Sequence, residues 1–191
     1  TPVYEDGSAM FEVPARTPVY FQALDAKGHA VQSMRSWSTL QPGETFSCVG
    51  CHEDKNASPP ATTRVTLAMQ AGPQRLTPSH GSPAGFSFPK RVQPILDKHC
   101  VECHDRKAVV AKTSSLSLEG RGELDKRAQK TWSDAYKALA NRKFAQWISP
   151  QSAPPMLPPY ETGAAKSPLI SLLTEGHEAV ELTPDELNVI A

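Results

Sequence analysis

Residues 91–104 read RVQPILDKHCVECH, and this stretch decides how the second half of the chain folds. Val92, Ile95 and Leu96 recur at the spacing of one helix face, which predicts an amphipathic helix. The helix runs directly into Cys-Val-Glu-Cys-His at residues 100–104. Two Cys separated by two residues and followed by His form the attachment signature of a c-type haem. The thiols at this spacing reach the two vinyl groups of one porphyrin, and the following imidazole is placed to bind the iron.

A second copy of the signature, Cys-Val-Gly-Cys-His, occupies residues 48–52. The two copies use all four Cys of the chain, which are Cys48, Cys51, Cys100 and Cys103. A zinc ribbon would separate its Cys pairs by about 15–20 residues, and a thioredoxin-like pair would need a βαβ setting. Neither description suits this chain. The sequence therefore predicts two covalent haem c groups, with His52 and His104 as the proximal iron ligands.

The ligand on the opposite side of each iron decides between electron transfer and ligand binding. For the second haem, His177 follows an apolar helix and Met156 lies in the proline-rich loop 153–160. We expect His177 to bind the iron and Met156 to pack against the haem. The alternative for His177 is a surface histidine beside Glu175 and Glu178.

For the first haem the sequence leaves the sixth ligand open. Met34, which precedes the motif on a predicted strand, is the favoured ligand. His29, at the tip of a turn, and His99, next to the second motif, are alternatives, as is an open site. Arg35 is a candidate to pair with a haem propionate, because guanidinium binds carboxylate through two hydrogen bonds. A solvated surface Arg35 is an equal alternative.

The expected elements around the first motif are extended. Residues 18–24 and 30–34 are rich in strand-forming side chains and flank a turn signal at 25–28, which predicts a hairpin. A short strand is expected at 64–68. In the second half, helices are expected to begin after an N-cap at Thr131, at Ser167-Pro168, and at a capping box over 183–186.

We therefore expect an α+β chain of two domains. Residues 1–85 form a β-rich module that carries the first haem and ends in a Pro-rich connector. Residues 86–191 form a mostly α, cytochrome c-like domain that carries the second haem. Because the chain starts without Met and stops inside a predicted helix, we expect it to be part of a longer protein.

The composition of the chain limits which classes of binding partner are expected. Lys and Arg (20) balance Asp and Glu (20), which argues against nucleic acid and membrane surfaces as partners. No apolar run approaches the roughly 20 residues of a membrane span. Only 39% of the residues are hydrophobic, so a porphyrin would enlarge a modest core. The sequence holds no Gly-rich phosphate loop or hydrolase motif, so no catalytic residue is assigned. Redox proteins are the expected partners.

Several segments beyond the Cys motifs carry a family resemblance. They lie at residues 32–36, 42–44, 47–53, 86–88, 92–97, 153–160 and 175–177. With these segments the chain resembles the di-haem C-terminal part of the hydrazine synthase alpha-subunit-like proteins of planctomycetes and related bacteria. The resemblance implies a periplasmic or otherwise extracytoplasmic redox protein. It also implies a second haem bound by two histidines, which supports His104 with His177.

One position departs from the family pattern. In hydrazine synthase, a Tyr four residues after the first motif's His binds the iron, and that His helps to hold zinc; the equivalent residue here is Asn56. The departure favours an ordinary His52–iron bond. The leading functional hypothesis is electron transfer through two closed haems. The alternatives are a redox enzyme with an open first haem acting on small nitrogen or oxygen species, and a structural or sensing haem module.

Overall fold

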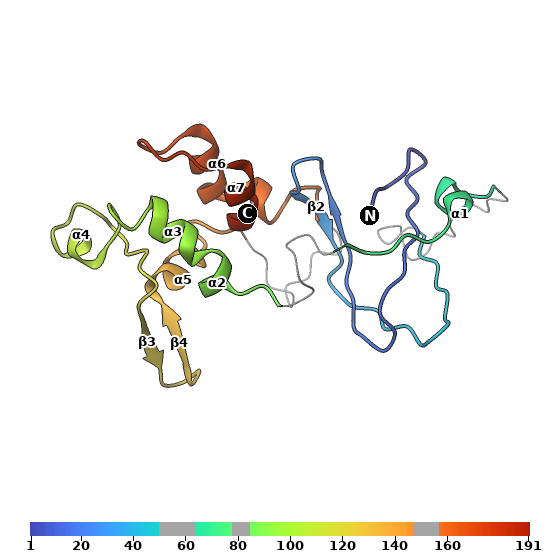
Figure 1. Ribbon diagram of the computed structural model, residues 1–191, viewed down its shortest axis with the longest axis horizontal. Helices are drawn as coiled ribbons and strands as arrows, with labels where there is room; N and C mark the ends of the chain where they lie inside the picture. Colours follow the sequence, from blue (N-terminus) through green and yellow to red (C-terminus); the bar gives the residue numbers. More distant parts are fainter. Residues whose placement is uncertain (50–63, 78–84, 147–156) are drawn as a thin grey trace. The chain divides into compact units, whose positions relative to one another are not determined.

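The computed structural model describes residues 1–49, 64–77, 85–146 and 157–191 (Figure 1). The chain forms two compact units. The first comprises Thr1–Phe21 and Met34–Ala84, and the second comprises Gln22–Ser33 and Gly85–Ala191. The segment Gln22–Ser33, although early in the sequence, thus belongs with the second unit.

This early segment is the hairpin that the turn signal predicts. Strand β1, Gln22–Leu24, pairs antiparallel with β2, Ala30–Ser33. The Asp25 carboxylate shapes the turn by accepting the backbone N–H groups of Lys27 and His29, each at 2.9 Å. An Asp side chain that binds the backbone two residues ahead is a common way to close a turn.

Strand β2 is hydrogen-bonded to residues 157–160 of the second unit. The Gln32 side-chain amide donates to the Leu157 carbonyl at 2.6 Å. The Tyr160 backbone N–H donates to the Val31 carbonyl at 2.9 Å. These two hydrogen bonds tie the hairpin to residues far along the sequence in the second unit. Met34 is the first residue after β2.

In the first unit the structure has a helix where a strand was expected. Residues 64–68 do not form a strand, and α1 spans Leu67–Ala71. Thr66 caps this helix, while the side chains of Asp6 and Ser8 accept the N–H groups of its first two residues. The strand prediction was wrong because these distant oxygens satisfy the donors that a helix start leaves free.

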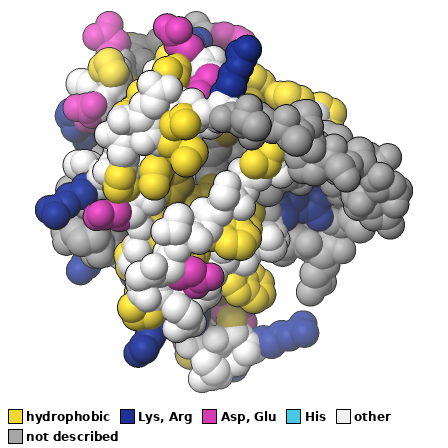
Figure 2. All heavy atoms as spheres, turned by 90° about the vertical axis from the view of Figure 1, so that its right-hand side faces the viewer, with side chains coloured by type: hydrophobic (Ala, Val, Ile, Leu, Met, Phe, Trp, Pro, Cys, Tyr) yellow, Lys and Arg dark blue, Asp and Glu magenta, His cyan; other side chains and the backbone are white. Residues whose placement is uncertain are grey.

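The described part of the first unit buries few apolar side chains. Ala68 is its one buried hydrophobic residue among those described, whereas Trp37, Phe46 and Met69 are 72%, 63% and 62% exposed. Figure 2 shows a face on which hydrophobic side chains lie open to the surface among other side chains and backbone. Isolated β-bridges hold this part together through backbone hydrogen bonds, such as the two between Val19 and Ser38.

The second unit holds the remaining elements (Figure 1). They are α2 (Phe88–Arg91), α3 (Gln93–His99), α4 (Arg106–Val110), β3 (Gly122–Asp125), β4 (Lys130–Ser133), α5 (Asp134–Leu139), the 3-10 turn η1 (Ala164–Lys166), α6 (Pro168–Glu175) and α7 (Pro184–Ile190). Among the described residues, no helix has the length and apolar character needed to cross a bilayer.

The predicted apolar face of α3 contributes to the core through Leu96 and through Val92, the residue that precedes the helix. The buried cluster consists of Val92, Leu96, Leu118, Ala135 and Leu139. Cys100 and Leu116 are partly buried against it. The core therefore reaches the first Cys of the second motif, so this side chain is positioned by packing and not only by sequence.

The sequence misplaces the start of α5. Residues 130–133 form strand β4, which pairs with β3, so Thr131 lies opposite Leu124 and does not cap a helix. Ser133 is the cap, and its side chain accepts the N–H of Tyr136. The expected start at Thr131 was therefore wrong, because cross-strand pairing takes up the backbone there.

The other two helix starts are confirmed. Helix α6 has Pro168 in its first turn and ends at Gly176, whose φ of 108° suits a residue without a Cβ. Helix α7 begins with the complete capping box of Thr183 and Glu186, in which each side chain binds the other residue's backbone N–H. Both starts rest on local signals within four residues.

Glu186 also ties α7 to the end of α3. One of its carboxylate oxygens lies 2.9 Å from Lys98 Nζ and 3.1 Å from His99 Nε2. The hydrogen bond from Lys98, followed by the Thr183 backbone N–H and the His99 bond, lowers the pKa of Glu186 from 4.5 to about 2. The carboxylate is thus stabilised in its charged form.

We expect the docking of α7 to weaken in acid through this residue. A carboxyl group with a depressed folded-state pKa stabilises the fold above its ordinary pKa and loses this contribution as the pH falls. For Glu186 the window runs from pH 4.5 down to about 2. Glu186→Gln should lower the melting temperature at pH 6 and flatten its decline through that window, as measured by circular dichroism. Asp185→Asn, exposed in the same turn, is the control; identical pH profiles for both variants and the parent would contradict the assignment.

Candidate functional site

The second motif forms a tight turn at the end of α3. The Cys100 N–H donates to the Leu96 carbonyl at 2.8 Å, continuing the helix. The N–H groups of Cys103 and His104 then both donate to the Cys100 carbonyl, at 3.2 and 3.0 Å. Burial, followed by the charge of neighbouring Cys103, raises the pKa of the Cys100 thiol. The turn therefore gathers two thiols and an imidazole at one place.

His177 lies opposite His104. The two ring centres are 5.9 Å apart and their planes differ by 23°. His177 is placed by the end of α6, because it follows the Gly176 at which that helix stops. Burial lowers the pKa of His104, and the neighbouring His177 lowers it further. A lowered pKa favours the neutral imidazole, which is the form that binds metals.

The distance between the rings suits one metal ion between them. A metal–imidazole nitrogen bond is about 2 Å, so two imidazoles on opposite sides of one ion have ring centres roughly 6 Å apart. Among the described residues, no group of three or more His, Cys, Asp or Glu side chains could hold a metal ion by itself. An iron porphyrin needs only two axial ligands from the protein. Two thiols beside two opposed imidazoles are therefore a donor set that fits a c-type haem.

Ser114 is a further contact of His104 that the sequence does not suggest. Its Oγ lies 2.7 Å from His104 Nδ1 and also 2.7 Å from the Leu116 carbonyl oxygen. The Leu118 N–H donates to the His104 carbonyl at 2.7 Å. The segment after α4 is thus fastened to His104 at both side chain and backbone.

The first motif is described only at its start. Cys48 is exposed, while Cys51 and His52 lie outside the described residues, as does Met156. Met34 is half-buried and its N–H donates to the Phe21 carbonyl at 2.8 Å. The axial ligation of the first haem and the role of the exposed Arg35 remain predictions.

The two histidines that the sequence offers as alternative ligands at the first motif, His29 and His99, lie in the second unit. His29 is half-buried at the hairpin turn, and its backbone N–H binds Asp25. The His99 imidazole binds Glu186. Each of these histidines is thus held within the second unit by a contact to a carboxylate.

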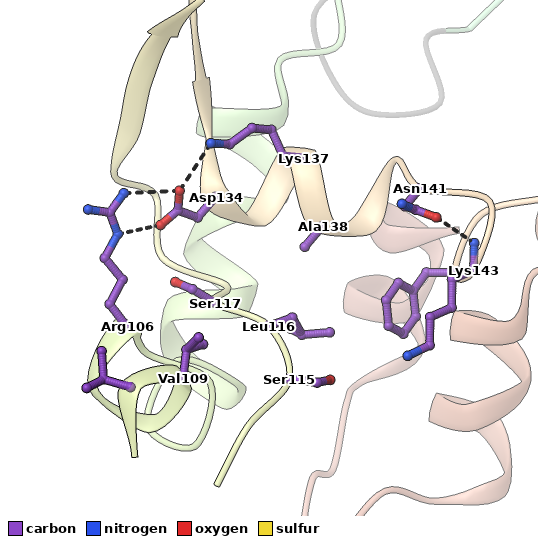
Figure 3. Close-up of a pocket in the computed structure, with 12 residues that line it drawn as sticks. Arg106, Val109, Ser115, Leu116, Ser117, Asp134, Lys137, Ala138, Asn141 and Lys143 are labelled. Atoms are coloured by element: carbon purple, nitrogen blue, oxygen red, sulfur yellow. Dashed lines mark hydrogen bonds and ion pairs between the residues drawn. The ribbon is translucent and has the colours of Figure 1, made fainter. Parts of the chain in front are cut away.

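An open pocket of about 700 Å³ lies between α4, the segment 115–117 and α5 (Figure 3). Leu116 and Ala138 contribute to its apolar floor. At one side Arg106 binds both carboxylate oxygens of Asp134, at 2.6 and 3.1 Å, and lowers the pKa of that carboxyl group. Neither His104 nor His177 lines this pocket, so it is separate from the pair of imidazoles.

Two comparisons relate the chain to known proteins. A family model described as the hydrazine synthase alpha subunit middle domain matches residues 1–53. The hydrazine synthase subunit alpha of Kuenenia stuttgartiensis is 26% identical over 54% of this chain and 19% of its own length. No solved structure gives a significant match. The matches support the resemblance to hydrazine synthase alpha-like proteins, and the chain spans about a fifth of the length of this relative.

Proposed function

We propose that this hydrazine synthase alpha-like chain is a di-haem c-type module that transfers electrons within a larger redox protein. The observation that carries the proposal is the pair of imidazoles, His104 and His177, with ring centres 5.9 Å apart beside the Cys-x-x-Cys-His turn. A closed six-coordinate haem is an electron carrier, because no axial position is free for a substrate.

Each residue of the second site has a distinct role in this proposal. Cys100 and Cys103 would form the thioether links, and the packing of Cys100 against the core supports this position for them. His104 and His177 would supply the two imidazole nitrogens that bind the iron. The bound haem supplies an iron that takes up and releases one electron. The chain supplies the position, the two axial nitrogens and a partly buried surrounding that tunes the potential.

The first motif completes the module in the same chemical terms. Cys48 and Cys51 would bind the first haem, with His52 as its proximal ligand and Met34 as the favoured distal ligand. With two haems in one chain, one haem can accept an electron from a partner and the other can pass it on. We place the protein in the periplasm or another extracytoplasmic space and expect redox proteins as its partners. The relative is a subunit by name, which supports a role within a larger assembly.

A second function is favoured by a specific observation. The matched family model covers residues 1–53, which include the first motif, and the relative is named a hydrazine synthase subunit. If the distal position of the first haem is open, this haem becomes the place for a reaction of small nitrogen or oxygen species. The second haem would then serve as its electron supply.

Carbon monoxide separates the two functions. It binds ferrous haem only where an axial position is free or easily vacated. We expect the dithionite-reduced protein to show no rapid change in its Soret band when carbon monoxide is mixed in a stopped-flow spectrometer. Rapid binding at one haem, with the other unaffected, would overturn electron transfer as the sole role and support an enzyme with an open first haem.

A further inference from the structure

The Ser114 hydroxyl takes part in three hydrogen bonds within the protein. A hydroxyl has one hydrogen to donate and two lone pairs that accept. The hydrogen is committed to the Leu116 carbonyl oxygen, 2.7 Å away, because two oxygens at that distance require a hydrogen between them. The Leu116 N–H uses one lone pair at 3.3 Å. The remaining lone pair faces His104 Nδ1 at 2.7 Å.

This arrangement fixes the proton on the imidazole. Because the hydroxyl hydrogen points to Leu116, Nδ1 of His104 must be the donor and carry the hydrogen. Nε2 of the same ring then keeps its lone pair, which is the state required of a metal ligand.

Ser114 is itself held firmly in place. The N–H groups of Thr113 and Ser114 both donate to the Ala108 carbonyl, at 3.0 and 3.2 Å. Helix α4, which contains Ala108, is capped by the side chain of Asp105, the residue after His104. His104, α4 and Ser114 thus form a closed loop, in which a rotation of the imidazole would break its hydrogen bond to Ser114.

We infer that Ser114 is a positioning residue that orients His104 as an iron ligand and lowers the reduction potential of the second haem. The inference rests on the proposed haem function. A hydrogen bond accepted from the far nitrogen of a ligating imidazole makes that ring a stronger electron donor. A stronger donor stabilises the oxidised iron, and the potential falls as a result.

The test uses the haem-loaded chain with Ser114 replaced by Ala, Cys and Thr. Ser115→Ala is the matched control, since Ser115 is exposed on the same segment. Redox titration followed in the Soret band gives the potential of each haem. The component that disappears in a chain with Cys100→Ser and Cys103→Ser identifies the second haem. Pyridine haemochrome absorbance gives the haem content.

We expect Ser114→Ala to shift the potential of the second haem upward, Ser114→Cys to shift it less, and Ser114→Thr to keep the parent value. Ser115→Ala should leave the potential unchanged. An unmoved potential in Ser114→Ala at full haem content would overturn the inference and leave the proposed function standing. Equal shifts in the Ala and Thr variants would also overturn it. Absence of covalent haem from the parent chain would instead refute the proposed function itself.

Discussion

Replacing His177 by Ala is expected to open the second haem to external ligands. His104 and His177 face each other with ring centres 5.9 Å apart, and no other residue of the described chain stacks against the His104 ring. Removing the imidazole at 177 therefore leaves one axial position to water. The reduced variant should bind one carbon monoxide per chain more than the parent, and its second haem should become high-spin.

The expected change is large because it would convert a closed carrier into a ligand-binding haem. The measurement is a carbon monoxide titration followed in the Soret band, together with electron paramagnetic resonance of the oxidised protein. Glu178→Gln is the matched control, because it alters the next residue without touching a candidate ligand. A spectrum of His177→Ala identical to that of the parent would exclude His177 as the ligand.

Replacing both Cys100 and Cys103 by Ser is expected to halve the covalent haem content and to weaken the second unit. Ser forms no thioether with a vinyl group, so the porphyrin loses its attachment. The core that Cys100 contacts is small, with five buried residues at its centre. Loss of a bound porphyrin should therefore lower the melting temperature and the helical circular dichroism signal together.

The matched control replaces Cys48 and Cys51 by Ser. It should also leave one haem per chain but preserve the helical signal, because α3 and its core lie in the other unit. Haem content comes from pyridine haemochrome absorbance of each purified variant. Unchanged haem content in the Cys100 and Cys103 variant would refute covalent attachment at this motif.

The parts of the fold that the sequence predicts correctly depend on signals a few residues long. The hairpin β1–β2 follows from a turn closed by Asp25. Helix α6 follows from Pro168 and Gly176 at its two ends, and α7 from the capping box at its start. In the hairpin and in α7, the side chain that fixes the structure lies within four residues of the backbone that it binds. In α6 the two residues act at the ends of the helix itself.

The parts that the sequence misplaces depend on distant partners. Helix α1 forms where Asp6 and Ser8, some sixty positions earlier, meet its first N–H groups. Residues 130–133 form a strand because β3 lies beside them. A single sequence contains no signal for the contact of Asp6 and Ser8 with α1 or for the pairing of β3 with β4. Predictions based on local propensity therefore gave the wrong element at both places.

The candidate site divides in the same way. The Cys-x-x-Cys-His motif is local, so its spacing alone predicts the two thiols and the proximal imidazole. His177 can be nominated because a histidine follows a helix stop, but its distance from His104 depends on the packing of α6. Ser114 has no sequence signature, since its contact with His104 depends on how the chain returns after α4.

The mass of the denatured chain tests the central claim most directly. The protein should be produced together with a cytochrome c maturation system, unfolded in acid and measured by electrospray mass spectrometry. We predict the polypeptide mass plus two haems, with no thiol left for alkylation. A bare polypeptide mass with four alkylated cysteines would contradict the account.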